Sequence, residues 1–336
     1  MGQMTSLQAL KIDNNRMSGI VPTEFAGMVS IQSFSFSQNA LTGTLPTQLG
    51  LLTTLRQLAV NGNMFAGTLP SEVGKLTALE DLEVHNNQLN GTLPTELGTL
   101  TAMTLLSLGM NAFTGTVPIG IFAMMTDLTM LSLHNNNLTG TLPSQLGAAT
   151  SLQNVSVHGN AFVGTLPTEI GQLTALVFLD VSTNFFTGTV PKEWRRLEAL
   201  ESLISGNNRL TGTLHSELGQ LTGLNFLWLN DNYLTGTIPK ALGDMTWLWS
   251  IRLENNAFTG TIPTSMSGWV TVGDFLFSGN NLTGSVNDIF CTGAVKWNTL
   301  QSDCLVARND DIDSAEIECQ CCTTCCNAAG EDCQAM

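Results

Sequence analysis

Residues 128–150 read LTMLSLHNNNLTGTLPSQLGAAT and hold one copy of a pattern that recurs along most of the chain. The pattern is L-x-x-L-x-L-x-x-N-x-L-T-G-T-L-P-x-x-L-G-x-L-T-x, and its asparagine returns every 24 residues apart from one spacing of 25. Repetition at a fixed period of this length indicates a solenoid or related array, not an ordinary globular domain. The recurring asparagines are Asn15, Asn39, Asn63, Asn87, Asn111, Asn136, Asn160, Asn184, Asn208, Asn232, Asn256 and Asn280.

The apolar residues before each asparagine alternate, as Leu131 and Leu133 do before Asn136. A period of two predicts a short strand with one buried face. A single repeat cannot bury that face, whereas stacked repeats bury a continuous apolar column. We therefore expect about twelve short strands in one parallel sheet, with neighbouring strands ~4.8 Å apart.

The other recurring residues have structural explanations. The chain must turn inward after each strand, and a buried asparagine amide can satisfy the backbone N–H and C=O groups that this turn leaves unpaired. The glycine of T-G-T is expected to supply a positive φ or close packing between coils. The proline column that begins at Pro22 and Pro46 predicts the start of a short helical turn on the opposite side of each coil.

The string L-T-G-T-L-P-x-x-L-G-x-L resembles the plant-specific class of leucine-rich repeats, which includes receptor-kinase ectodomains, receptor-like proteins and polygalacturonase-inhibiting proteins. The resemblance implies an α/β solenoid, a right-handed horseshoe with a concave parallel β-sheet. It further implies short flanking second strands near T-G-T and 3-10 or short helical turns on the convex side. It does not name a ligand, because the class binds peptides, steroids, glycans and other proteins.

Two segments are predicted: twelve leucine-rich repeats over residues 1–286 and a cysteine-rich cap over residues 287–336. The cap motif C-x-C-C-T-T-C-C resembles the endings of leucine-rich-repeat proteins of diatoms and related algae. Met1 aligns in mid-repeat, and the cysteine-bearing amino-terminal cap that is usual in the plant class is missing. We therefore expect a fragment whose signal or anchor lay upstream of Met1.

The cysteines and the sequons both favour a secretory route. An even number of cysteines in a short tail predicts disulfides formed in an oxidising compartment, and a thiolate cluster holding zinc or copper is the alternative. The sequons make Asn90, Asn137, Asn154 and Asn281 candidate glycosylation sites. The candidate disulfide residues are Cys291, Cys304, Cys319, Cys321, Cys322, Cys325, Cys326 and Cys333.

Composition and motifs argue against several functional classes. The formal net charge is −15, and only 12 residues are Lys or Arg, so neither nucleic acid nor an anionic membrane surface is an expected partner. No apolar run is long enough to span a membrane. No nucleophile elbow or phosphate-binding loop occurs, and we predict no enzyme, no cofactor and no metal. His85, His134 and His158 share one column and could hold a metal, but a solvated surface is the favoured interpretation.

The expected concave face is mostly small and polar, except in repeats eight to eleven. Large rings occur there beside charged residues, a composition typical of binding hot spots. We expect Trp228 and Arg252 to make a cation–π contact and Arg252 to bind an anionic or carbonyl group of the ligand. Rings that merely lie flat on the sheet are the alternative. The predicted site is Phe178, Asp180, Phe226, Trp228, Trp249, Arg252 and Glu254.

These observations predict an extracellular-type binding module, a receptor-like protein or ectodomain, that recognises a protein, peptide or glycan on its concave face. The alternative is an ice-binding protein. Thr pairs stacked on successive coils would form a flat grid of ~7 by ~4.8 Å, similar to the Thr-x-Thr ladders of β-solenoid antifreeze proteins. Ala66, Asn90 and Val163 interrupt that grid. The alternative site comprises Thr187, Thr189, Thr211, Thr213, Thr235, Thr237, Thr259 and Thr261.

Overall fold

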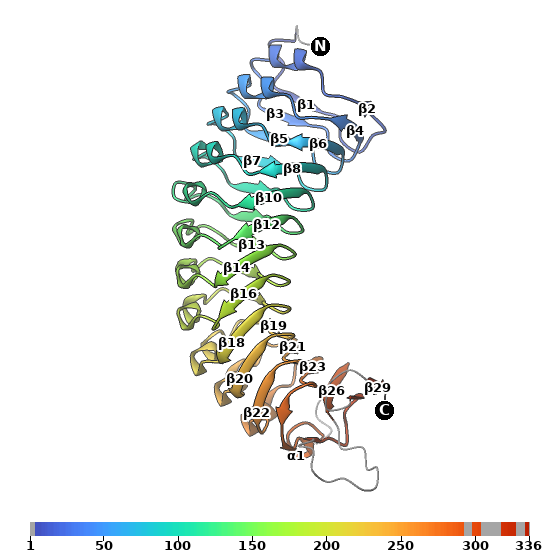
Figure 1. Cartoon of the computed structure of the whole chain (residues 1–336), viewed down its shortest axis with the longest axis vertical. Helices are drawn as coiled ribbons and strands as arrows, with labels where there is room; N and C mark the ends of the chain where they lie inside the picture. The colour runs from blue at the N-terminus through green and yellow to red at the C-terminus, as the bar shows by residue number, and fades with distance from the viewer. Residues whose placement is uncertain (1–3, 292–297, 304–316, 327–332, 336) are drawn as a thin grey trace. The chain divides into compact units, whose positions relative to one another are not determined.

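The computed structural model describes residues 4–291, 298–303, 317–326 and 333–335, and the chain divides into two compact units, Met1–Val163 and Gly164–Met336. Within each unit the repeats form coils of one kind (Figure 1): a three-residue main strand, a turn, a short flank strand and a 3-10 helix. The 24-residue sequence period is therefore also the structural period.

The main strands of each unit pair in parallel, in the register Leu10↔Phe34 and Leu227↔Ile251, which joins residues 24 positions apart. The predicted parallel sheet of short strands is thus confirmed. In the first unit these strands are β1 (Ala9–Lys11), β3 (Ser33–Ser35), β5 (Gln57–Ala59), β7 (Asp81–Glu83), β9 (Leu105–Ser107), β11 (Met130–Ser132) and β13 (Asn154–Ser156). In the second unit they are β15 (Phe178–Asp180), β17 (Ser202–Ile204), β19 (Phe226–Trp228), β21 (Ser250–Arg252), β23 (Asp274–Leu276), β26 (Thr299–Asp303) and β28 (Thr324–Cys326).

The flank strands, which carry the T-G-T residues, form a second parallel sheet in each unit. In the first unit they are β2 (Ser18–Gly19), β4 (Ala40–Gly43), β6 (Met64–Thr68), β8 (Gln88–Thr92), β10 (Ala112–Thr116), β12 (Asn137–Gly140) and β14, which continues to the unit boundary (Ala161–Thr165). In the second unit they are β16 (Phe185–Gly188), β18 (Arg209–Thr213), β20 (Tyr233–Thr237), β22 (Ala257–Gly260) and β24 (Asn281–Leu282). The short second strands implied by the resemblance are therefore present.

The 3-10 helices lie across each coil from the main strands, and each begins after an extended residue that is proline everywhere except His215. They are η1 (Thr23–Gly27), η2 (Thr47–Leu51), η3 (Ser71–Lys75), η4 (Thr95–Thr99), η5 (Ile119–Ile121), η6 (Ser144–Ala148), η7 (Thr168–Gln172), η8 (Lys192–Arg196), η9 (Ser216–Gln220), η10 (Lys240–Asp244) and η11 (Thr264–Gly268). The extra residue of the 25-residue spacing falls near η5, which has three residues where the others have five. Both the 3-10 turns and the proline positions match the sequence prediction.

The recurring asparagines bond the interior of each coil to the coil before it. In Asn63, the amide Nδ2 donates to the carbonyl of Val60 in its own coil at 3.0 Å and to that of Phe36 in the preceding coil at 2.9 Å. Its Oδ1 accepts the backbone N–H of Leu41 at 3.0 Å. The same bonds recur at Asn87, among others. Each amide therefore satisfies backbone groups of two coils, as buried polar groups require.

The sheet continues past residue 286, beyond the twelve repeats found in the sequence. Strands β26 and β28 add to the main sheet of the second unit, and β29 (Cys333–Ala335) pairs antiparallel to β28. A short helix, α1 (Asn287–Phe290), and the pair β25 (Gly284–Ser285) and β27 (Ile317–Glu318) complete this end. Across the described residues, no helix has the length and apolar character needed to cross a membrane.

Replacing Asn160 with alanine should destabilise the fold strongly. Its Nδ2 donates to the carbonyls of Leu133, Val157 and His158, and its Oδ1 accepts the N–H of Leu138. Because alanine leaves these groups without that partner, we expect a loss of at least ~3 kcal/mol in the free energy of unfolding, at ~1–3 kcal/mol for each buried unsatisfied group.

Urea unfolding followed by circular dichroism measures this loss. The matched control is Asn137→Ala, whose side chain is exposed and should cost less than ~0.5 kcal/mol. Equal stabilities for the two variants would contradict a structural role for the asparagine column.

Candidate ligand-binding surface

Three rings gather on the outward face of the main sheet in the second unit. Phe226 and Trp228 project from β19, and Trp249 precedes β21 in the next coil. The ring centroids of Phe226 lie 6.3 Å from Trp228 and 5.6 Å from Trp249, both in edge-to-face arrangements. Such aromatic pairs add about 0.5–1.5 kcal/mol beyond the area they bury. We call this cluster, with Arg252 and Glu254, the aromatic surface.

Trp228 is fixed on the sheet by two contacts. Its Nε1–H donates to Ser250 Oγ at 3.0 Å, and the guanidinium carbon of Arg252 lies 4.2 Å from its ring centroid. The cation–π contact expected from the sequence is therefore present, and it holds the ring against the sheet. Trp249 remains 46% exposed, so it offers the cluster's most accessible ring surface.

Arg252 and Glu254 add buried ionisable groups to this surface. Within the described part of the chain, Arg252 Nε and Glu254 Oε2 are buried without a hydrogen-bond partner. Burial raises the pKa of Glu254 to about 7, and the nearby Asp231 adds to the rise, while a backbone N–H and Arg252 act in the opposite direction. Glu254 therefore changes charge near neutral pH.

Phe178 and Asp180 lie apart from the aromatic surface. Their strand, β15, is separated from β19 by β17, and the register Phe178↔Ser202↔Phe226 puts the two phenylalanine backbones about 9.6 Å apart at ~4.8 Å per strand. Asp180 is buried, and its Oδ1 accepts hydrogen bonds from the backbone N–H and the hydroxyl of Ser182. Asp180 thus resembles a structural group more than a ligand contact.

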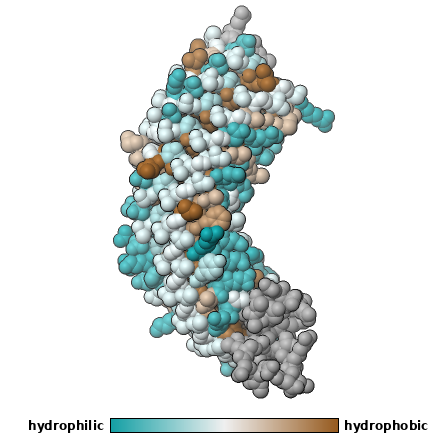
Figure 2. Space-filling model, viewed as in Figure 1, coloured by the Kyte–Doolittle hydropathy of each residue, from teal (hydrophilic) through white to brown (hydrophobic). Residues whose placement is uncertain are grey.

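Trp247, which is 65% exposed and stands two residues before Trp249, is not among the site residues predicted from the sequence. Its position lies outside the columns that alternate on the main strand, so the period of two could not assign it to a face. Figure 2 shows that the face in view is mostly polar or of intermediate hydropathy, with scattered apolar spots.

The histidine column forms a second polar cluster, in the first unit. The rings of His134 and His158 are stacked with centroids 4.8 Å apart, and Ser132 and Ser156 lie within hydrogen-bond distance of their Nδ1 atoms. His85 is in similar contact with a serine, and burial lowers its pKa. The serine contacts favour the solvated-surface interpretation over a metal site.

The threonines of the flank are exposed, and the methyl groups of several of them pack against the glycine of the next coil. A Cβ built on Gly236, which has φ +76°, would lie 2.6 Å from Cγ2 of Thr213 in the preceding coil. Thr189 and Gly212 repeat this arrangement at 2.7 Å. Glycine is therefore required here both by the positive φ and by the methyl group above it.

The register of the flank differs from the predicted grid. Flank strands pair residues 22 positions apart, so Thr213 faces Thr235 and not its own equivalent, Thr237. Thr211 correspondingly faces Tyr233. The expected rectangular grid of stacked equivalent threonines is wrong, because each coil is offset by two residues along the strand.

Bulky side chains also interrupt the flank. Phe185 and Tyr233 are 42% and 63% exposed, and the guanidinium of Arg209 lies 4.6 Å from the Phe185 ring centroid. Thr187 pairs with Arg209 and Thr259 pairs with Asn281, so larger side chains interrupt the rows of threonines. These interruptions can be recognised in the sequence, because the larger residues directly follow a recurring asparagine.

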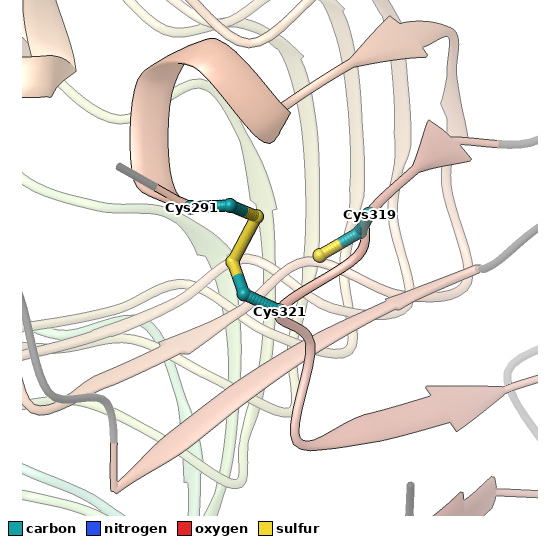
Figure 3. Close-up of side chains that lie close together, drawn as sticks. All are labelled: Cys291, Cys319 and Cys321. Carbon is teal, nitrogen blue, oxygen red and sulfur yellow. A yellow bond between two sulfur atoms is a disulfide. The ribbon is translucent and has the colours of Figure 1, made fainter. Parts of the chain in front are cut away.

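The tail cysteines form disulfides where their side chains are described. Cys291 bonds to Cys321 and Cys319 bonds to Cys322, and Figure 3 shows the Cys319 sulfur beside the first of these bonds. Three of these sulfurs lie within 4.8 Å of one another, but bonded sulfurs are not the thiolates that bind zinc. The side chains of Cys304, Cys325, Cys326 and Cys333 lie outside the described residues.

The candidate glycosylation sites fall in two environments. Asn90, Asn137 and Asn281 are exposed on flank strands, where a glycan would extend into solvent. Asn154 is half-buried on the main strand β13. A glycan on Asn90 would cover part of the threonine rows of the first unit.

Comparison with known proteins agrees with this architecture. A family model described as Leucine Rich Repeat matches residues 78–100, 127–149 and 223–245. No curated protein sequence matches the chain. Solved structures do: that of PEPR1–AtPEP1 has a TM-score of 0.81 and 33% identity, over 84% of this chain and 40% of that one. The chain thus carries leucine-rich repeats, and it is similar to plant proteins of the plant-type class.

Two further solved structures are similar to the chain at lower identity. The Arabidopsis receptor kinase HAESA, in complex with the peptide hormone IDA and the co-receptor SERK1, has a TM-score of 0.82 and 26% identity over 99% of this chain and 52% of that one. This leucine-rich-repeat protein thus spans about half the length of the receptor chains it resembles, or less. A plant ice-binding protein has a TM-score of 0.57 and 21% identity over 81% of this chain and 82% of that one, a likeness of fold alone.

Replacing Glu254 with glutamine should change how stability depends on pH. The pKa of Glu254 in the folded protein, about 7, exceeds its ordinary value of 4.5. The stability that neutral Glu254 contributes is therefore fully present below pH 4.5 and is lost as pH rises through 7. We expect Glu254→Gln to be more stable than the parent at pH 8.5 by ~3 kcal/mol, from ~1.4 kcal/mol for each unit of pKa.

Denaturant unfolding of both proteins between pH 4 and 9 tests this difference. The gap should close at pH 4, where both side chains are neutral. Glu96→Gln, at an exposed position, serves as the control and should show no comparable gap. A difference that does not vary with pH would contradict the raised pKa.

Proposed function

We propose that this protein is an extracellular-type binding module that captures a protein or peptide ligand on the main sheet of its second unit. The observation that carries the proposal is the aromatic surface, where Phe226, Trp228 and Trp249 form one cluster on a rigid hydrogen-bonded sheet. A rigid platform loses little ordering entropy when it binds. Aromatic anchors beside an arginine are typical of the residues that supply most binding energy.

The comparisons support a binding role of this kind. HAESA, which has the same fold, binds a peptide hormone and a co-receptor. The disulfides Cys291–Cys321 and Cys319–Cys322 support an oxidising, secretory environment. A glycan ligand belongs to the same proposal, since aromatic faces and hydroxyl groups suit sugars as well. Phe178, two strands away on β15, lies outside this cluster, and the Arg252 guanidinium lies on the Trp228 ring within it.

The ligand-capture proposal predicts a large effect of Trp249→Ala. Trp249 is 46% exposed and makes fewer structural contacts than Trp228, so its loss should reduce affinity with little loss of stability. We expect a decrease of ~2 kcal/mol or more, about 30-fold in Kd. Trp228→Ala should cost at least as much, and part of that cost should appear as destabilisation.

A ligand for this measurement comes from screening displayed peptides and secreted proteins against the immobilised full chain, with affinities from calorimetry. Tyr233→Ala is the matched control, because Tyr233 is an exposed aromatic residue on the flank sheet. A ligand whose affinity falls with Tyr233→Ala and not with Trp249→Ala would place the site on the flank and contradict the proposal.

Ice binding is the second candidate, supported by the exposed threonines of the flank and by the fold shared with a plant ice-binding protein. If the flank binds ice, the protein should inhibit ice recrystallisation, and Thr213→Tyr should abolish that inhibition while Trp228→Ala leaves it intact. The offset register and the side chains of Arg209 and Tyr233 disfavour a flat ice-binding face. We therefore expect no inhibition from the unmodified protein in a splat-cooling assay.

A further inference from the structure

The aromatic surface lies among more acidic groups than basic ones. Asp231 and Glu254 lie at one end of the exposed columns, and Asp274 lies beside Ser250 in the register of β21 and β23. Arg252 is the one Lys or Arg on the exposed columns of strands β15 to β23. The formal charge of the whole chain, −15, has the same sign as this local excess.

The single arginine is already engaged. Its guanidinium lies on the Trp228 ring and its Nε is buried, so its charge already takes part in a contact within the protein. In the described ranges, no Lys, Arg or His lies within ion-pair distance of Asp231, Glu254 or Asp274, and the ion pair found there is Arg56–Glu80. None of the three carboxyl groups therefore forms an ion pair among the described residues, and Arg252 acts on Glu254 only from a longer distance.

Neutral amides are the partners of Asp231. Its two carboxylate oxygens accept hydrogen bonds from Asn230 Nδ2 at 2.6 Å and Asn255 Nδ2 at 2.8 Å. These bonds hold the carboxylate in place without neutralising it. Glu254 stands next to it with Oε2 buried and unpartnered. A ligand cation would supply what both groups lack, and it would favour the charged form of Glu254.

Trp249 adds a ring face suited to a cation. Its indole lies against Gly273, where an added Cβ would be 3.4 Å from Nε1, and its backbone carbonyl accepts the N–H of Asp274. An exposed indole beside a carboxylate combines the two features that attract Lys and Arg side chains, the negative ring face and the opposite charge.

We propose that the ligand of the aromatic surface is an extended, basic peptide segment, with a Lys or Arg side chain on Trp249 and its positive charges facing Asp274, Glu254 and Asp231. This inference rests on the proposed function and specifies its ligand class. The acidic chain steers such a ligand toward the surface and sets its specificity. Because cation binding favours ionised Glu254, binding releases a proton and is tighter at pH 8 than at pH 6.

Selection of random twelve-residue peptides on the immobilised full chain tests the ligand class. Peptides that bind the parent protein are retained only if they fail to bind Trp249→Ala. We expect the retained pool to be enriched in Lys and Arg over Asp and Glu by several-fold. A retained pool with an acidic or neutral bias overturns the basic-ligand inference and leaves the proposed function standing. If no peptide depends on Trp249, both are overturned.

The selected peptides then allow a charge test on single residues. Asp274→Asn and Glu254→Gln should each weaken binding about three- to ten-fold at low salt, and the effect should shrink as salt is added. Asp244→Asn removes the same charge from an exposed position on η10 and is the matched control, with no more than a two-fold effect. Equal effects of Asp244→Asn and Asp274→Asn would contradict a local charge interaction. Calorimetry in two buffers of different ionisation enthalpy should show proton release that Glu254→Gln abolishes.

Discussion

The asparagine amide inside each coil is the interaction on which the rest of the structure depends. The chain can turn inward after a three-residue strand only if the carbonyl and N–H groups of that turn find partners away from water. The two N–H groups of one amide are shared among three carbonyls and its oxygen accepts one backbone N–H, so a single side chain bonds to two coils, as Asn232 does with Ser205, Leu229, Asn230 and Leu210. The hydrogen bonds that satisfy the polar groups of the turn are therefore also the bonds that hold one coil against the next. This coupling explains why the period of the sequence is so strict while the exposed residues vary.

Much of the fold follows from the sequence because both rest on one period. The alternating leucines, the proline before each 3-10 turn and the glycine of T-G-T could be placed without any knowledge of the partner coil. The flank register could not, because it depends on how far each coil is offset along the strand, and no single repeat encodes that offset. The disulfide Cys291–Cys321 likewise depends on where the tail lies against the end of α1.

The candidate site, like the fold, could be predicted only in part from the sequence. Column positions identified Phe226, Trp228 and Arg252, and the structure brings these together. Residue type alone could not reveal that Asp180 is buried, that Oε2 of Glu254 is buried without a hydrogen-bond partner or that Trp247 is exposed. Those properties depend on neighbours one strand away. The chemical properties of a surface built by stacking therefore cannot be read from one repeat alone, because the environment of each side chain is formed by the coils on either side.

The register of the main sheet has a consequence for how such a surface evolves. Since equivalent residues of successive repeats lie side by side there, duplication of a repeat immediately creates a stripe of identical side chains. A duplicated carboxylate would face its own copy and repel it, whereas a duplicated ring would need room to stack on its copy, as His134 does on His158. The column Phe178, Ser202, Phe226, Ser250 alternates large with small, and so escapes both penalties. The flank, offset by two residues, sets unlike positions against each other and is free of this restriction. After a duplication, we therefore expect sequence changes to be favoured first among the exposed residues of the main sheet. The face that is best able to acquire a ligand is then also the face whose repeats diverge soonest.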